Sequence, residues 1–166
     1  MTWQKSPVSL RFQPPHDDQA IAACRTTLEL NPNFHLARKC LGDAYLMKQM
    51  YGEAITELQT VRATVGNVPY GLGDLGYAYG ISGRMNEARK VLDELTGFSQ
   101  QGYEVQYDMA LIYHGLGDRE NTLVWLEKAL DAQTYSITFL RCEPFWQNLR
   151  SEPRFVALLK KMGLEK

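Results

Sequence analysis

The hydrophobic and small residues of this chain recur in a fixed order with a period of 34 residues. One aromatic position recurs three times: Tyr45, Tyr79 and Tyr113. Three residues before each tyrosine stands a small residue: Gly42, Gly76 and Ala110. A second set follows with the same period, alanine first and leucine four residues later: Ala54 with Leu58, and Ala88 with Leu92. A repeat of this length is typical of a solenoid of stacked units.

Apolar residues within each repeat follow helical spacing and predict two helices per repeat. A first helix is expected at 17–30, and Asn31-Pro32 ends it because a residue before proline is disfavoured in the α region. Three helical hairpins are expected to follow: 33–48 with 51–64, 68–82 with 85–97, and 102–115 with 118–131. The turns between partners contain glycine and are short, so each pair is expected to be antiparallel.

The small residues predict where the two helices of a hairpin approach each other. Gly42 is expected to face Ala54, and Gly76 to face Ala88, which brings the helix axes to roughly 8–10 Å. A glycine inside a helix costs about 1 kcal/mol relative to alanine. Close packing of the two helices would offset this cost.

These positions resemble the tetratricopeptide repeat, a helical hairpin with Leu, Gly and Tyr in its first helix and Ala with a large apolar residue in its second. The matching residues are Leu41, Gly42, Tyr45, Ala54 and Leu58; Leu72, Leu75, Gly76, Tyr79, Ala88 and Leu92; and Met109, Ala110, Tyr113, Leu126 and Ala129. Some positions depart from the pattern: Arg38, Gln106 and Thr122. The resemblance implies an all-α fold, a right-handed α-solenoid of antiparallel helix hairpins.

The resemblance also divides the chain. Residues 1–16 are expected to form an irregular arm, because prolines 7, 14 and 15 prevent a regular helix. Residues 17–166 are expected to form a single domain: a half repeat at 17–32, full repeats at 33–66, 67–100 and 101–134, and a C-terminal cap at 135–166. Ser151 as N-cap and the apolar stripe after it predict a last helix that ends at Gly163. This tail resembles the C-terminal tetratricopeptide regions of bacterial winged-helix regulators and adenylate-cyclase-like proteins.

Composition and charge argue against several function classes. The formal net charge is −1 and Lys and Arg are not clustered, so no nucleic-acid partner is expected. No run of about 18 apolar residues occurs, so no membrane span is expected. The N-terminal residues lack the apolar core of a signal peptide. Three cysteines without Cys-x-x-Cys spacing, Cys24, Cys40 and Cys142, indicate reduced thiols and a cytoplasmic location.

The sequence shows no catalytic constellation. Its histidines are far apart in the repeat frame: His16, His35 and His114. Cys24 occupies the apolar position held elsewhere by Leu58 and Leu92, which favours a core thiol over a nucleophile. The two Gly-x-Gly stretches lack the preceding strand of a phosphate-binding loop. We therefore predict a chain that is not an enzyme and has no catalytic, cofactor-binding or metal-binding residues.

In tetratricopeptide repeats the first helices line a concave groove, and the resemblance assigns a set of residues to it. They are Leu36, Lys39, Asp43, Tyr70, Asp74, Tyr77, Glu104, Tyr107, Asp108, Leu111 and His114. Tyrosine gives large contact area, and carboxylates favour lysine or arginine in the ligand. The expected partner is a protein or peptide segment with basic and apolar residues. A C-terminal carboxylate ligand is disfavoured, since aspartates stand where the family's carboxylate clamp has basic or amide groups.

Two functions of different classes fit these observations. The first is a non-catalytic protein–protein interaction scaffold that binds a peptide or partner domain in the groove. The second is a regulatory or sensor C-terminal region of a multidomain bacterial transcription regulator or signalling protein, acting by self-association or by packing on the effector domain. The helix at 17–30 has no preceding first helix to cover it. Its apolar side is therefore either open to a second copy of the chain, which would give a homo-oligomer through the N-terminal edge, or covered by the arm at 1–16.

Overall fold

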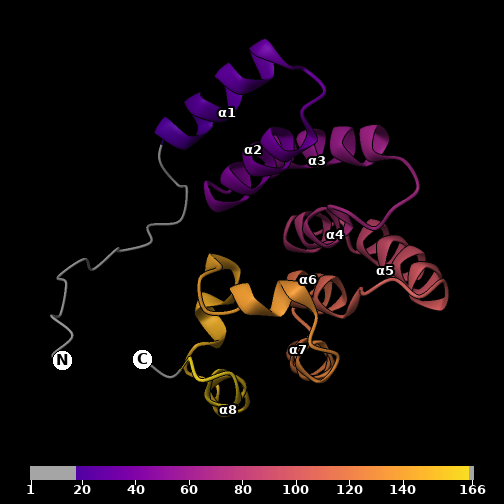
Figure 1. Ribbon diagram of the computed structural model, residues 1–166, viewed down its shortest axis with the longest axis vertical. Coiled ribbons are helices and arrows are strands. Elements are labelled where there is room, and N and C mark those ends of the chain that lie inside the picture. Colours follow the sequence, from indigo (N-terminus) through magenta and orange to yellow (C-terminus); the bar gives the residue numbers. More distant parts are fainter. Residues whose placement is uncertain (1–17, 165–166) are drawn as a thin grey trace, which may run out of the picture.

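The computed structural model describes residues 18–164, and within this range the chain consists of helices and short connections (Figure 1). The α-helices of the repeats are α1 (Asp18–Leu30), α2 (His35–Met47), α3 (Tyr51–Val65), α4 (Leu72–Ile81), α5 (Met85–Gln100), α6 (Gln106–Gly115) and α7 (Arg119–Asp131). Two 3₁₀ helices follow, η1 (Tyr135–Phe139) and η2 (Pro144–Leu149), and then α8 (Pro153–Lys161). The predicted arm at 1–16 lies outside the described residues.

The predicted helical hairpins are confirmed. α2 packs on α3, α4 on α5 and α6 on α7, while α1 packs on α2 as a half repeat (Figure 1). The second and third turns use glycine as expected, because Gly83 and Gly117 have φ of +82° and +77°. In the first turn Gln49 takes the left-handed conformation with φ of +59°, and Gly52 lies inside α3.

Two of the three periodic tyrosines, Tyr45 and Tyr79, join successive helical units by hydrogen bonds. The Tyr45 hydroxyl accepts a hydrogen bond of 2.7 Å from Arg25 of α1, and the Tyr79 hydroxyl accepts one of 2.8 Å from Gln59 of α3. In both pairs the donor stands 20 residues before the tyrosine. Tyr45 and Tyr79 thus each connect the first helix of a repeat to the second helix of the preceding unit.

The expected contacts of the small residues hold for one hairpin and are wrong for another. A Cβ at Gly42 would lie 2.9 Å from Leu58 and 3.6 Å from the Ala54 carbonyl, so Gly42 faces its own partner helix. A Cβ at Gly76 would instead meet Ile112 of α6 at 2.5 Å. The physical reason is that α4 packs closely on α6, the first helix of the next repeat, along its glycine face.

The chain after α7 turns back along the array (Figure 1). α8 packs against α7, and Arg154 of α8 forms ion pairs of 2.8 and 2.9 Å with Glu120 and Glu127. η2 instead lies against the first helices α4 and α6 through aromatic contacts. The N-cap of α8 is Glu152, with Pro153 in the first turn, so the prediction of Ser151 as N-cap was wrong by one residue.

Candidate functional site

The C-terminal segment covers part of the predicted concave groove. The ring centroid of Phe145 lies 4.9 Å from that of Tyr77, and the indole Nε1–H of Trp146 donates a hydrogen bond of 2.7 Å to the Tyr107 hydroxyl. Tyr77, Tyr107 and Leu111 are buried. These three predicted groove residues are therefore covered in this structure, two of them by the chain's own aromatic residues.

His114 is held by the same segment. Its Nε2 lies 2.9 Å from the carbonyl oxygen of Phe145, and its ring centroid lies 5.2 Å from that of Trp146. Burial lowers the pKa of His114, so the neutral ring with the proton on Nε2 donates to the Phe145 carbonyl at neutral pH. This contact gives His114 a positioning role for η2.

The rest of the concave face remains open between α2 and the η1–η2 segment. One pocket of about 310 Å³ is lined by Lys39, Tyr70, Asp74, Asp108 and Ser136, among others. A second pocket of about 200 Å³ is lined by Asp43, Met47, Phe139, Glu143 and Phe145, among others. Lys39, Asp43 and Met47 lie on one face of α2 at helical spacing, so both pockets follow this face. We call the two pockets together the α2 groove.

Lys39 is paired with two carboxylates in the middle of the α2 groove. Its ammonium lies 2.8 Å from Asp43 on the same helix and 3.1 Å from Asp74 on α4. Desolvation alone would lower the pKa of Lys39, but the two carboxylates outweigh it and raise this pKa well above its usual value. Lys39 therefore stays charged and is already satisfied by residues of the chain.

Other carboxylates of the groove have fewer partners. Asp108 forms no hydrogen bond or ion pair with the described residues, and burial raises its pKa to about 7, with a further contribution from Asp74. One carboxylate oxygen of Asp43, Oδ1, is buried without a hydrogen-bond partner in the described part of the chain. Glu143 accepts a hydrogen bond from the Tyr107 hydroxyl, and burial raises its pKa as well. The groove thus has an excess of carboxylates over ammonium groups.

The remaining predicted residues lie at the rim or away from the groove. Leu36, at the start of α2, is 52% exposed. The ring of Tyr70 packs edge-on against His35 with 5.4 Å between centroids. Glu104 is exposed in the connection before α6 and lines neither pocket. The α2 groove therefore combines Lys39, Asp43, Tyr70, Asp74 and Asp108 from the predicted set.

The sequence reasoning missed one wall of the groove. Ser136, Phe139 and Glu143 come from the segment after the last repeat, where no periodic pattern indicates their direction. The aromatic pair of Phe145 and Trp146 after a proline could have indicated that this segment packs on the repeats. Two large apolar side chains in a short non-repetitive segment require a surface to cover them.

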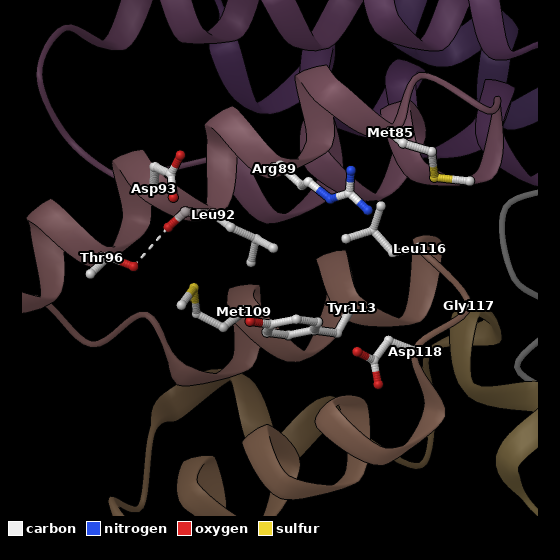
Figure 2. A pocket seen from close by; sticks show the side chains of 10 residues that line it. All are labelled: Met85, Arg89, Leu92, Asp93, Thr96, Met109, Tyr113, Leu116, Gly117 and Asp118. Carbon is white, nitrogen blue, oxygen red and sulfur yellow. Dashed lines mark hydrogen bonds between the residues drawn. The ribbon is translucent and has the colours of Figure 1, made fainter.

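A larger cleft, of about 690 Å³, lies on the other side of the array between α5 and α6 (Figure 2). Asp93 and Tyr113 occupy the positions that are hydrogen-bonded in the two preceding repeat junctions. Among the side chains drawn in Figure 2, no hydrogen bond joins these two residues. Leu92 and Met109 form the buried floor between them. We interpret this cleft as a repeat junction that is incompletely closed.

The outward face of α1 bears on the predicted self-association. Its described exposed positions include Ala22, Ala23, Arg25, Thr26 and Glu29, while Ile21 and Cys24 are buried. The large apolar side chain that α1 exposes is Leu30, at the end of the helix, while the other exposed side chains named here are small or polar. Self-association at the N-terminal edge stays a prediction.

Potential metal ligands and the buried cysteine were two further candidates in the described range. No group of three or more His, Cys, Asp or Glu residues in the described range has a geometry that could hold a metal ion. Cys24 is buried, as predicted for a core thiol, and burial raises its pKa to about 12. No helix in residues 18–164 has the length and apolar character needed to span a bilayer.

The raised pKa of Asp108 makes a prediction about stability. The folded chain binds a proton at Asp108 up to about pH 7, whereas an ordinary aspartate loses it near 3.8, so the free energy of unfolding falls as pH rises between these values. Asp108→Asn removes this effect. While no cation occupies the site, and because solvent reaches part of this side chain, we expect a gain of about 2 kcal/mol at pH 8 and little change at pH 4.

Urea unfolding at both pH values measures this difference. The matched control is Asp93→Asn, which removes the same charge from an exposed position on α5 and is expected to change stability little at either pH. A loss of stability in Asp108→Asn at pH 8 would contradict the destabilisation that we assign to the ionised carboxylate of Asp108.

Comparison with known protein families gives one match. A model described as tetratricopeptide repeat matches residues 103–134, which contain α6 and α7. No curated protein and no solved structure was found to match the chain significantly. The likeness to regions of winged-helix regulators therefore stays a prediction. The match and the packing of neighbouring hairpins agree, and the chain contains a tetratricopeptide repeat at 103–134 within an all-helical array of the same architecture.

Proposed function

We propose that this chain is a non-catalytic protein–protein interaction module whose α2 groove binds a partner segment with a basic residue between apolar residues. The tetratricopeptide repeat supports a general role in binding proteins. The observation that carries the finer proposal is the Asp108 carboxylate, which lines an open pocket and lacks a cationic partner among the described residues. The nearest ammonium group, that of Lys39, is already bound by Asp43 and Asp74.

A lysine or arginine of the partner would pair with Asp108 in a partly desolvated setting. Such a charge-assisted hydrogen bond is stronger than a neutral one, and the apolar surface of Tyr70 and the 41% exposed Phe139 would contact the flanking residues. Phosphate groups would meet an excess of carboxylates here, which disfavours a nucleic-acid ligand.

The charge state of Asp108 predicts how binding depends on pH. A cation binds the ionised carboxylate, and the pKa of Asp108 in the free chain is about 7. Below this value the carboxyl group must lose its proton before it can pair with the cation. We therefore expect the affinity for a basic peptide to fall by up to about tenfold from pH 8 to pH 6.

Fluorescence anisotropy tests the proposal directly. The probe is a labelled short peptide with arginines flanked by leucines, and the control peptide has glutamate in place of each arginine. We expect the arginine peptide to bind, and Asp108→Asn to weaken it by about tenfold at pH 8, since a lost charge-assisted bond costs about 1.4 kcal/mol. Asp93→Asn should leave binding unchanged. Equal binding of both peptides, or no loss in Asp108→Asn, would rule out this site.

A further inference from the structure

The sequence before α1 joins the structure at one end of the α2 groove. α1 begins at Asp18, and the Asp18 carboxylate lies 2.5 Å from the ammonium group of Lys48. Lys48 directly follows Met47, the last residue of α2, and Met47 lines the groove pocket that contains Asp43 and Glu143. The first residue of α1 therefore lies beside this pocket.

Residues 1–17 have the composition that we propose for a ligand of this groove. Their basic side chains are Lys5 and Arg11, their single acidic residue is Asp17, and their large apolar residues include Trp3, Val8, Leu10 and Phe12. The groove contributes carboxylates from Asp43, Asp74, Asp108 and Glu143, against the ammonium of Lys39. The charges of the segment and of the groove are complementary.

The length of the segment also fits. Arg11 precedes Asp18 by seven residues, and seven extended residues span at most about 25 Å. α2 has 13 residues and is about 20 Å long. Arg11 can therefore reach either pocket along α2 from the point where α1 begins. Lys5 lies farther from Asp18 in the sequence, so the longer connection lets it reach both pockets as well.

We infer that residues 1–17 occupy the α2 groove of their own chain, with Arg11 and Lys5 on its carboxylates and apolar side chains against Tyr70 and Phe139. This occupancy rests on the proposed function, because it presupposes a groove that accepts basic segments. A partner must then displace the arm. A short tether gives an effective concentration in the millimolar range, so an arm with an intrinsic Kd of about 0.1 mM would weaken partner binding about tenfold.

The experiment compares the full chain with the full-length double variant Lys5→Glu/Arg11→Glu. The probe is a labelled synthetic peptide of residues 1–17 with the natural sequence, followed by fluorescence anisotropy. We expect the double variant to bind this peptide about tenfold more tightly than the unmodified chain does, since its own arm no longer competes. Adding Asp108→Asn to the double variant should abolish most of the gain. Arg89→Glu/Lys90→Glu, an equal charge change at exposed positions of α5, should bind like the unmodified chain.

The other outcomes separate the arm from the groove. If the peptide of residues 1–17 fails to bind both chains while the arginine–leucine peptide binds, the arm inference is overturned and the proposed function stands. If neither peptide binds, both are overturned. Equal affinity of the 1–17 peptide for both chains would show that the arm does not occupy the groove. Light scattering adds a last outcome: a dimer of the unmodified chain that the double variant loses would place the arm in a second copy and overturn binding within one chain.

Discussion

Replacing Trp146 with alanine is expected to lower the free energy of unfolding by about 4 kcal/mol, since removal of a fully buried tryptophan costs about 3–5 kcal/mol. Trp146 is fully buried, and its ring centroid lies 5.6 Å from that of Tyr107 and 5.2 Å from that of His114. The substitution leaves a cavity on the concave face. It also removes the indole donor to the Tyr107 hydroxyl. Urea unfolding followed by far-ultraviolet circular dichroism measures the loss.

Trp125→Ala provides the control with the same residue type. Trp125 is half-buried on α7, and the Lys128 ammonium lies 3.9 Å from its ring centroid. Because part of this side chain already stays in contact with water, we expect a smaller loss than at Trp146, of about 1–2 kcal/mol. A similar loss in both variants would contradict the role of Trp146 as the anchor of the C-terminal segment. Limited proteolysis should agree, with trypsin cleaving at Arg141 or Arg150 sooner in Trp146→Ala than in Trp125→Ala.

The periodic part of the fold was predictable because each repeat uses the same contacts. The helix expected at 17–30 is described at Asp18–Leu30, and the helix expected at 118–131 is α7 at Arg119–Asp131. Local signals were sufficient here, since proline, glycine and apolar spacing act within a few residues. The connections between repeats depend on packing, and this is why the direction of Gly76 was predicted wrongly.

The candidate site was predictable on one side only. The spacing of Lys39 and Asp43 placed both on the groove side of α2, and the repeat frame brought Asp74 and Asp108 to the same concave surface. The opposite wall depends on contacts between residues that are 36 and 39 positions apart, Tyr107 with Glu143 and Tyr107 with Trp146. No short-range pattern encodes such contacts, so the sequence alone did not show that η2 covers part of the concave face. The α2 groove is the part of that face that η2 leaves uncovered.

The second large effect is expected from Gly80→Ala, where the backbones of α4 and of the end of α6 approach each other closely. A Cβ at Gly80 would lie 2.5 Å from the carbonyl carbon of Gly115 and 2.8 Å from the amide nitrogen of Leu116. These are backbone atoms, so no side chain can move aside, and the two helices must separate. Overpacking of this kind costs about 1–3 kcal/mol or more, and we expect a loss of about 3 kcal/mol in free energy of unfolding.

Gly97→Ala is the matched substitution and should act in the opposite direction. Gly97 lies inside α5, and a Cβ there would meet no atom within 4 Å. Alanine should then contribute its helix propensity alone, a gain of up to about 1 kcal/mol. Urea unfolding of both variants at one pH distinguishes the two effects. A gain in free energy of unfolding in both variants would mean that α4 and α6 have room for a side chain between them. A loss in Gly80→Ala with a gain in Gly97→Ala would show that the absence of a side chain at Gly80 sets the distance between the second and third repeats.

That distance positions Asp74 and Asp108 on the two helices, so Gly80→Ala is also expected to weaken binding in the α2 groove.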